Sequence, residues 1–413
     1  MMKVILVTAT NVRRLLIFII LSGGLYLAFI TDFFYLLLVL FLIIFFDILL
    51  RIVIRVRRGK TYIKDKPTRY ENLYVVSHPY LPWVYRSNYI INNKQFLNYP
   101  LHYKKYTAAV TRTNSYGFID GSEGNRDITE PKKMGEKRIV CIGASTTGNY
   151  IQSGETVYSY PSELEEILNN KGFDNVKVIN CGVGGYNSAE ILIRFALQIV
   201  DYEPDFIVIY HAYNDIRSYL TPNFRSDYSN SRRNLGELNW RLFLADVFPS
   251  FGLVFMDYLR KKILAGNIRN SLLNLVSKGT VDLSLDPSQG LNTYQRNLQS
   301  IIDIARSRKI KVLLSTYCHF LYPAIQNSEV HLKYQELVKL ENKIMRNLAE
   351  NNNLPIVDAE NLFPYDEIYF VDSVHFTPEG MRKLAEIISP SLEKLLLKDN
   401  SKKDFVQLSD LDT

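Results

Sequence analysis

The pattern of apolar and polar positions divides the chain of 413 residues into four stretches. Residues 15–50 are apolar almost throughout, and residues 61–135 mix aromatic, Asn and Lys residues without a sustained period. From residue 136 onward, short β-branched runs alternate with amphipathic stretches, a pattern typical of strands and helices that follow one another along the chain. The polar stretch 398–413 is expected to be a disordered tail.

The alternating region predicts a layered α/β domain. Its β-branched runs predict five strands, at 138–142, 176–180, 206–210, 310–315 and 354–357. Apolar residues at three and four spacing predict helices at 161–170, 188–200, 294–307 and 331–351. A last helix is expected to begin near Thr377, a capping residue followed by a proline. The prediction is a three-layer α/β/α sandwich around a parallel sheet.

The apolar residues 15–50 are too many for one untilted membrane span, which needs about 20 residues. Asp32 lies near the middle, where a carboxylate is costly in hydrocarbon but natural at a turn. The sequence therefore predicts a two-helix transmembrane hairpin, with spans 15–30 and 33–50, in an N-terminal anchor of residues 1–60. We expect an integral protein of a bacterial-type plasma or inner membrane that contacts the lipid bilayer through this hairpin.

Charge is concentrated in the same region. The net charge is +7, and the first 60 residues hold eight Lys and Arg against two Asp, so six of the seven excess charges lie there. The nearly neutral remainder argues against a nucleic-acid partner. Basic residues flank both ends of the hairpin, so the positive-inside rule predicts that the α/β domain is cytoplasmic. A single long tilted helix would instead place that domain on the extracytoplasmic face.

A long insertion, 217–289, follows the third predicted strand and is rich in aromatic residues. Because it follows the carboxyl end of a strand, it is expected on the ligand side of the sheet. Two interpretations stay open: a lid or substrate platform, and a helical pair that packs on the core or the bilayer.

The three cysteines, Cys141, Cys181 and Cys318, lie in or at the end of apolar runs and are expected to be small buried residues. Their spacing indicates neither a disulfide framework nor a zinc site.

Residues with catalytic chemistry follow the predicted strands. Ser145 comes after the first strand among small residues, where its hydroxyl can be exposed at the sheet edge. Gly185 lies in a glycine-rich loop after the second strand, where a backbone N–H can approach a ligand. Asn214 follows the third strand and can donate to developing negative charge without titrating. Asp372 and His375 are three apart, so a carboxylate can bind one imidazole nitrogen and leave the other as general base.

These features, each ambiguous alone, occur in one order. Over about residues 137–397 they resemble the serine, glycine, asparagine and histidine blocks of the SGNH or GDSL-like hydrolase family of serine esterases. The resemblance implies a flavodoxin-like parallel sheet in a catalytic domain of residues 136–397, preceded by a leader, 61–135, that packs on it. It implies a catalytic triad and an oxyanion hole, with no metal or cofactor. The implied triad is Ser145, Asp372 and His375, and the implied oxyanion hole is Ser145, Gly185 and Asn214.

Two positions depart from the family pattern. Ala144 stands where the Gly-Asp-Ser form has an aspartate, and Ala212 stands where the third block has a glycine, which would narrow the oxyanion pocket. Neither change removes a reacting group. Near the blocks, Tyr186, Tyr213 and His319 are candidates for substrate binding.

The resemblance implies a serine hydrolase that cleaves an ester bond, O-acyl or O-acetyl, through an acyl-enzyme. Two alternatives stay open. The same triad could transfer the acyl group to a sugar hydroxyl, which would make an O-acyltransferase of envelope polysaccharide, or the fold could be a catalytically silent binding or scaffold protein. The expected substrate is an ester, an acylated glycan or an acylated lipid, and the sequence fixes neither its acyl chain nor the oligomeric state.

Overall fold

The computed structural model describes scattered positions between 20 and 52 and then residues 75–76, 78–92, 110–119, 131–148, 151–153, 156–232, 280–321 and 327–409. The chain divides into two compact units, Met1–Asn72 with Leu238–Gly266, and Leu73–Glu237 with Asn267–Thr413. Within the described positions, no helix has both the length and the apolarity that a membrane span needs. The predicted spans 15–30 and 33–50 lie mostly outside the described residues, as does the middle of the predicted insertion.

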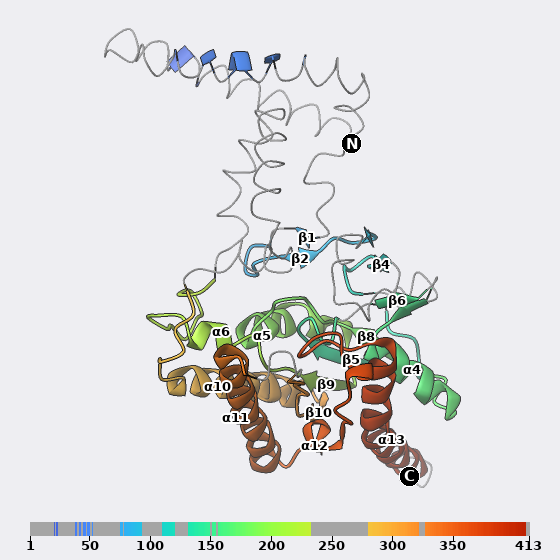
Figure 1. The fold of residues 1–413 in the computed structure, drawn as a ribbon. Coiled ribbons are helices and arrows are strands. Elements are labelled where there is room, and N and C mark those ends of the chain that lie inside the picture. Colours follow the sequence, from blue (N-terminus) through green and yellow to red (C-terminus); the bar gives the residue numbers. More distant parts are fainter. Residues whose placement is uncertain are drawn as a thin grey trace. The chain divides into compact units, whose positions relative to one another are not determined.

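A five-stranded parallel sheet forms the centre of the second unit (Figure 1). Its order is β11-β10-β9-β5-β8. The strands are β5 (Lys137–Gly143), β8 (Val176–Asn180), β9 (Phe206–Tyr210), β10 (Lys311–Ser315) and β11 (Ile356–Val357). Every residue of β5 and β9 is buried, as expected for strands that are covered on both faces. The predicted parallel sheet is therefore confirmed, with strand ends within two residues of the predicted ones.

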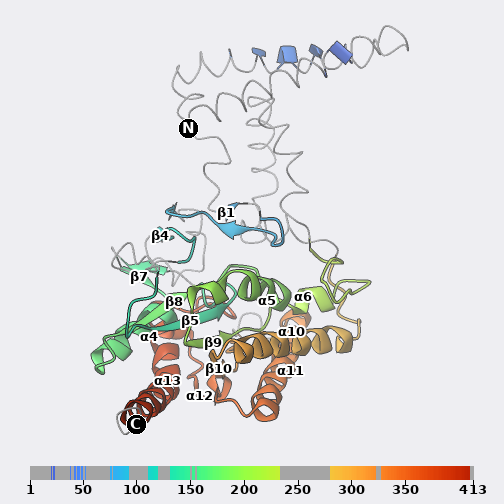
Figure 2. The same cartoon turned by 180° about the vertical axis from the view of Figure 1, so that it is seen from behind.

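Helices cover both faces of the sheet. One face carries α4 (Tyr160–Asn170) and α13 (Pro378–Ser409), which pack on each other. The other carries α5 (Ser188–Leu197), α10 (Ser288–Ser307) and α11 (Glu329–Asn352), as Figures 1 and 2 show from opposite sides. Shorter helices are η3 (Ile199–Tyr202), α6 (Ile216–Tyr219), α12 (Ala359–Leu362) and η6 (Glu367–Tyr369).

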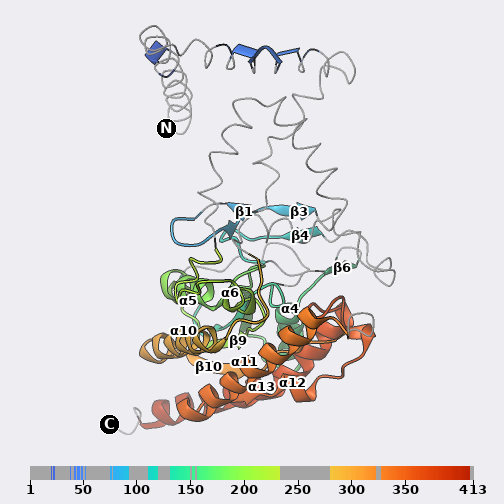
Figure 3. The same ribbon diagram turned by 60° about the vertical axis from the view of Figure 1, so that its left-hand side comes forward.

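The last helix corrects one prediction. A disordered tail was expected from residue 398, but α13 continues to Ser409 (Figure 3). At the predicted boundary, the Asp399 carboxylate accepts hydrogen bonds from Lys137 of β5 and Lys311 of β10. These ion pairs tie the helix to the amino edge of the sheet, and a reading of composition alone cannot reveal such a contact.

The segment before the sheet contains short antiparallel pairs that the sequence did not predict. They are β1 (Val75–Val76) with β2 (Val84–Tyr85), and β3 (Ile90–Asn92) with β4 (Val110–Arg112). A third pair, β6 (Ile151–Ser153) with β7 (Thr156–Tyr158), follows β5. The leader contacts the sheet directly, because Ile119 forms a β-bridge with Asn180 at the end of the edge strand β8.

The register of the parallel strands brings their carboxyl ends into line. Gly143, the last residue of β5, lies opposite Tyr210, the last residue of β9, and Tyr210 lies opposite Ser315 of β10. The loops that follow these strands therefore emerge side by side at one edge of the sheet. All three cysteines are buried, as predicted, and burial raises the pKa of the Cys181 and Cys318 thiols to about 12.

Candidate active site

Ser145 occupies a tight loop at the end of β5. It is partly exposed, whereas residues 137–144 and 146–148 are buried. The loop is closed by a hydrogen bond from the Gly148 N–H to the Ala144 carbonyl, at 2.9 Å. It packs backbone against backbone on the loop after β8, since a Cβ atom at Gly182 would lie 2.1 Å from the Gly148 nitrogen. Glycine at position 182 is therefore needed for the two loops to meet, and Ser145 is left as the accessible side chain.

The loop that carries Asp372 and His375 is held by its own backbone. Phe370 and Phe376 form an antiparallel bridge around it, and the Val371 N–H donates to the His375 carbonyl at 2.8 Å. The Asp372 Oδ1 atom accepts the backbone N–H groups of residue 374 and of His375, both at 2.9 Å. Backbone N–H groups of the same loop thus orient the Asp372 carboxylate independently of its contact with the His375 ring.

Ser145, His375 and Asp372 form a continuous hydrogen-bonded chain. The His375 Nε2 atom lies 2.8 Å from Ser145 Oγ, and its Nδ1 atom lies 2.8 Å from Asp372 Oδ2. The side chains of His375 and Asp372 are 20% and 13% exposed, so they are shielded but remain at the surface of the site. A carboxylate on Nδ1 favours the tautomer in which Nε2 can accept a proton from the serine.

Gly185 lies in a tight turn beside the serine, which we call the glycine turn (residues 183–186). The turn is closed by the Tyr186 N–H, which donates to the Val183 carbonyl at 3.2 Å. Gly185 has φ +79°, a left-handed conformation that glycine adopts without steric cost. A Cβ atom at Gly184 would lie 4.0 Å from the Ser145 Cβ atom, so the turn packs directly against the serine.

Asn214 lies on the loop after β9 and also contacts the glycine turn. Its side-chain amide donates to the Tyr186 carbonyl at 2.9 Å. The preceding residue, Tyr213, has φ +78°, which is a strained conformation for a residue other than glycine. Its N–H donates to the buried Glu341 carboxyl of α11 at 2.8 Å, and this contact stabilises the strained backbone.

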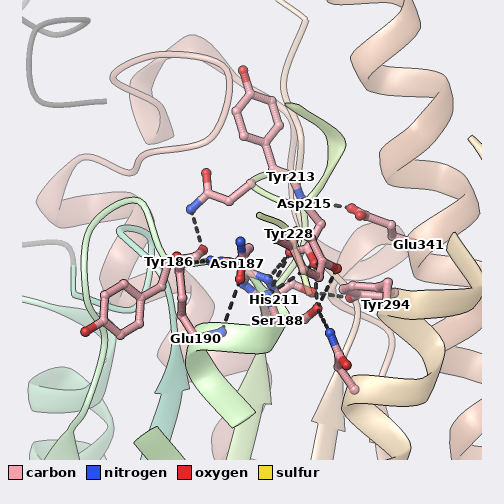
Figure 4. A network of polar contacts seen from close by, with 12 residues as sticks. Tyr186, Asn187, Ser188, Glu190, His211, Tyr213, Asp215, Tyr228, Tyr294 and Glu341 are labelled. Carbon is pink, nitrogen blue, oxygen red and sulfur yellow. Dashed lines mark hydrogen bonds and ion pairs between the residues drawn. The ribbon is translucent and has the colours of Figure 1, made fainter. Parts of the chain in front are cut away.

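A buried polar network supports this loop from below (Figure 4). The Asp215 carboxylate accepts hydrogen bonds from His211 at 2.7 Å, Tyr228 at 2.5 Å and both the N–H and the hydroxyl of Ser188, the first residue of α5. Burial opposes ionisation of Asp215, but these hydrogen bonds outweigh it and lower its pKa. Burial and the nearby Asp215 charge raise the pKa of Glu341 well above its usual range. The network thus fixes the loop that presents Asn214.

The predicted substrate-binding residues have different surroundings. Tyr186 is 1% exposed and its hydroxyl donates to the Trp83 carbonyl, so its position supports a structural role and not a substrate contact. The Tyr213 ring stacks on His319 at a centroid distance of 5.8 Å. His319 is 7% exposed, and within the described part of the chain neither of its ring nitrogens has a hydrogen-bond partner. Burial lowers the pKa of His319 to about 4, so the ring is neutral at neutral pH.

Three residues around the glycine turn were missed by the sequence analysis. Tyr85 of β2 accepts a hydrogen bond from the Gly184 N–H at 2.8 Å. Arg232 donates to the Gly185 carbonyl, and its guanidinium lies 5.9 Å from the Trp83 ring centroid. No spacing or motif connects these residues to the glycine turn in the sequence. Among the described residues, no group of three or more His, Cys, Asp or Glu is arranged to hold a metal ion.

Comparison with known proteins places this site in a family. Residues 141–383, more than half of the chain, match the model of the GDSL-like lipase/acylhydrolase family. Similar solved structures include a GDSL-like lipase from Bacteroides thetaiotaomicron, with 18% identity, TM-score 0.39 and coverage of 65% of this chain and 93% of that one. They also include an acetyl xylan esterase, with 17% identity, TM-score 0.39 and coverage of 62% and 98%.

A lipase/acylhydrolase from Enterococcus faecalis is similar at 19% identity, with TM-score 0.38 and coverage of 62% of this chain and 96% of that one. A comparison with curated proteins found no match. The family match spans the serine loop, the glycine turn, the asparagine loop and the Asp-x-x-His loop. The chain is therefore a member of the GDSL-like lipase/acylhydrolase family, and it is an enzyme that acts on ester bonds.

Proposed function

We propose that the chain is a membrane-anchored serine hydrolase that cleaves an O-acyl ester through an acyl-enzyme on Ser145. The observation that carries the proposal is the contact between Ser145 Oγ and His375 Nε2, at 2.8 Å, with Asp372 on the other ring nitrogen. A serine hydroxyl at this distance from an oriented imidazole can lose its proton as it attacks a carbonyl.

In the first half-reaction, Ser145 Oγ bonds to the ester carbonyl carbon while its proton passes to His375 Nε2. Asp372 stabilises the resulting imidazolium. The carbonyl oxygen becomes an oxyanion, which the backbone N–H groups of Ser145 and Gly185 and the Asn214 amide would bind. His375 then returns the proton to the leaving alcohol as the C–O bond breaks.

In the second half-reaction, water attacks the acyl-enzyme. His375 accepts a proton from the water, and the acid leaves when the bond to Ser145 breaks and Ser145 regains its proton. Water as the acceptor makes the enzyme a hydrolase, whereas a sugar hydroxyl in its place would make it an acyltransferase. The chemistry at the serine is the same in both cases, so the acceptor has to be measured.

We also propose that Tyr213 and His319 contact the substrate. The buried His319 ring makes no hydrogen bond within the described part of the chain, which costs free energy. A hydrogen bond to a substrate hydroxyl or carbonyl would offset this cost. The ring is stacked on Tyr213, the neighbour of Asn214, and the next residue, Phe320, donates its N–H to the Ser373 carbonyl at 2.8 Å. These contacts support a position for His319 between the asparagine loop and the loop of Asp372 and His375.

The membrane anchor is part of the proposal and is supported by the apolar composition of residues 15–50 and by the basic residues on both sides of it. Carbonate extraction of membranes should leave the full chain in the pellet. If the domain is cytoplasmic, as proposed, added protease should cut it only after the cells are lysed. Cleavage in intact cells would instead favour a single tilted span.

The function is tested with the purified full chain in detergent and with p-nitrophenyl esters of graded acyl length. The wild-type chain should release p-nitrophenol, and Ser145→Ala should lose that activity while its melting temperature stays nearly unchanged. Ser307→Ala is the matched control, because Ser307 is exposed at the far end of α10. Adding a sugar acceptor and measuring its acylation separates transfer from hydrolysis. Full activity in Ser145→Ala would contradict the proposal.

A further inference from the structure

The glycine turn needs support from outside itself. Its two central residues, Gly184 and Gly185, lose more conformational freedom on folding than any other residue type would. The turn itself contributes one closing hydrogen bond, from the Tyr186 N–H to the Val183 carbonyl. Because an oxyanion donor has to point in one direction before the substrate arrives, the contacts that order this turn bear directly on catalysis.

Two side chains from distant parts of the chain hold the turn. The Tyr85 hydroxyl accepts the Gly184 N–H at 2.8 Å and so fixes the peptide between Val183 and Gly184. The Arg232 Nη2 atom donates to the Gly185 carbonyl and so fixes the peptide between Gly185 and Tyr186. The peptide between these two carries the Gly185 N–H, and it is restrained because both of its neighbours are held.

Arg232 is itself held in place. The same Nη2 atom lies 2.7 Å from Glu190 Oε2, and the side chains of Arg232 and Glu190 are 15% and 7% exposed. Glu190 is fixed in turn, because it caps the first turn of α5 by accepting the Asn187 N–H at 2.7 Å. The Arg232 guanidinium also lies over the ring of Trp83, which is 2% exposed. A shielded ion pair with a rigid partner gives the guanidinium one position.

We propose that Arg232 is a positioning residue of the oxyanion hole, which directs the Gly185 N–H by holding the Gly185 carbonyl. This inference rests on the proposed ester hydrolysis. Arg232 comes from the start of the insertion and Trp83 from the leader, so these two segments are required for the rate of the chemical step. The carbonyl oxygen of the bound substrate carries little charge before the reaction and a full negative charge in the oxyanion. A misdirected Gly185 N–H therefore weakens transition-state binding more than substrate binding, so the loss of Arg232 should lower kcat and leave KM nearly unchanged.

The test compares Arg232→Ala, Arg232→Lys and the wild-type full chain with a p-nitrophenyl ester. Arg232→Ala should lower kcat roughly 10- to 100-fold, the range for a misaligned catalytic group, with KM within about threefold. Arg232→Lys keeps a nitrogen donor and should retain more of the kcat. Guanidinium chloride at a concentration far below the denaturing range should restore part of the kcat of Arg232→Ala and leave that of Arg225→Ala unchanged. Arg225 is the matched control, because it is an exposed arginine of the same segment.

The outcomes separate the two proposals. If the wild-type chain hydrolyses no ester, the proposed function fails and this inference fails with it. If the wild-type chain is active and Arg232→Ala matches it in kcat, the inference alone is overturned. The inference would also be overturned if guanidinium did not raise the kcat of Arg232→Ala and if Arg232→Lys lost as much kcat as Arg232→Ala. A general loss of folding would produce that result.

Discussion

The two halves of the candidate site are built in different ways. The serine, histidine and aspartate half uses short loops that fix their own geometry, and Asp372 and His375 are three residues apart. The oxyanion half is assembled from contacts across the chain. Tyr85 lies 99 residues from Gly184, and Glu341 lies 128 residues from Tyr213. Ser145 and His375 are 230 residues apart, but each is held by its own loop. The glycine turn and the Tyr213 backbone are instead held by side chains from the leader, the insertion and α11.

The largest expected effect belongs to the locally built half. Asp372→Asn keeps an oxygen that can accept the two backbone N–H groups, so the loop should stay folded. The amide cannot stabilise an imidazolium as the carboxylate does, and it favours the wrong tautomer of His375. We expect kcat to fall about 10⁴-fold with little change in melting temperature. A loss below tenfold in steady-state hydrolysis would remove Asp372 from the proposed triad.

Asn214→Ala tests the other half by removing a proposed oxyanion donor. It also removes the hydrogen bond to the Tyr186 carbonyl, so the glycine turn loses a contact. We expect kcat to fall about 10²- to 10³-fold, as for other oxyanion donors, with KM nearly constant. If KM rises and kcat stays unchanged, Asn214 binds the substrate and does not stabilise the transition state.

His319 lies next to both halves, and its burial predicts a pH effect on stability. Because the folded-state pKa is lowered to about 4, the unfolded chain takes up a proton below about pH 6.5 that the folded chain does not. The wild-type chain should therefore lose about 2 kcal/mol more unfolding free energy than His319→Gln when the pH falls from 7 to 5. Urea unfolding at the two pH values measures this difference. Equal losses would show that the ring is not shielded as described.

The smallest expected effect is that of Tyr85→Phe, which removes the acceptor of the Gly184 N–H and keeps the ring. The loss of one hydrogen bond corresponds to about a tenfold change in kcat. Tyr80→Phe is the control, because Tyr80 belongs to the leader and is 69% exposed. When Tyr85→Phe is combined with Arg232→Lys, the two effects on kcat should be non-additive if both residues order the glycine turn. Strict additivity would mean that the leader and the insertion act independently.

Most of the fold could be predicted because its signals are local. Burial on both faces gives β9 a continuous apolar run and β5 an apolar run after Arg138, and the Asn187 and Ser159 caps mark where α5 and α4 begin. The sequence did not reveal that α13 continues past residue 398, where Asp399 forms ion pairs with Lys137 and Lys311, because contacts with distant strands leave no local signal.

At the site too, the sequence indicated residues with a local motif and did not indicate residues whose role depends on distant contacts. Ser145, Gly185, Asn214, Asp372 and His375 each lie in a recognisable block, so the sequence could single them out as candidates. Tyr85 and Arg232 carry no motif, and their roles arise from three-dimensional contacts with the backbone of the glycine turn. Tyr186 was a candidate for substrate binding. Its side chain is buried and its hydroxyl donates to the Trp83 carbonyl of the leader, a contact that no local pattern in the sequence indicates.

The most direct test of the account is to label the full chain with a fluorophosphonate and map the modified peptide by mass spectrometry. The account predicts one label per chain, on Ser145, with labelling slowed in His375→Ala and absent in Ser145→Ala. A label on another residue, or equal labelling of Ser145→Ala and the wild-type chain, would contradict the assignment of Ser145 as the nucleophile.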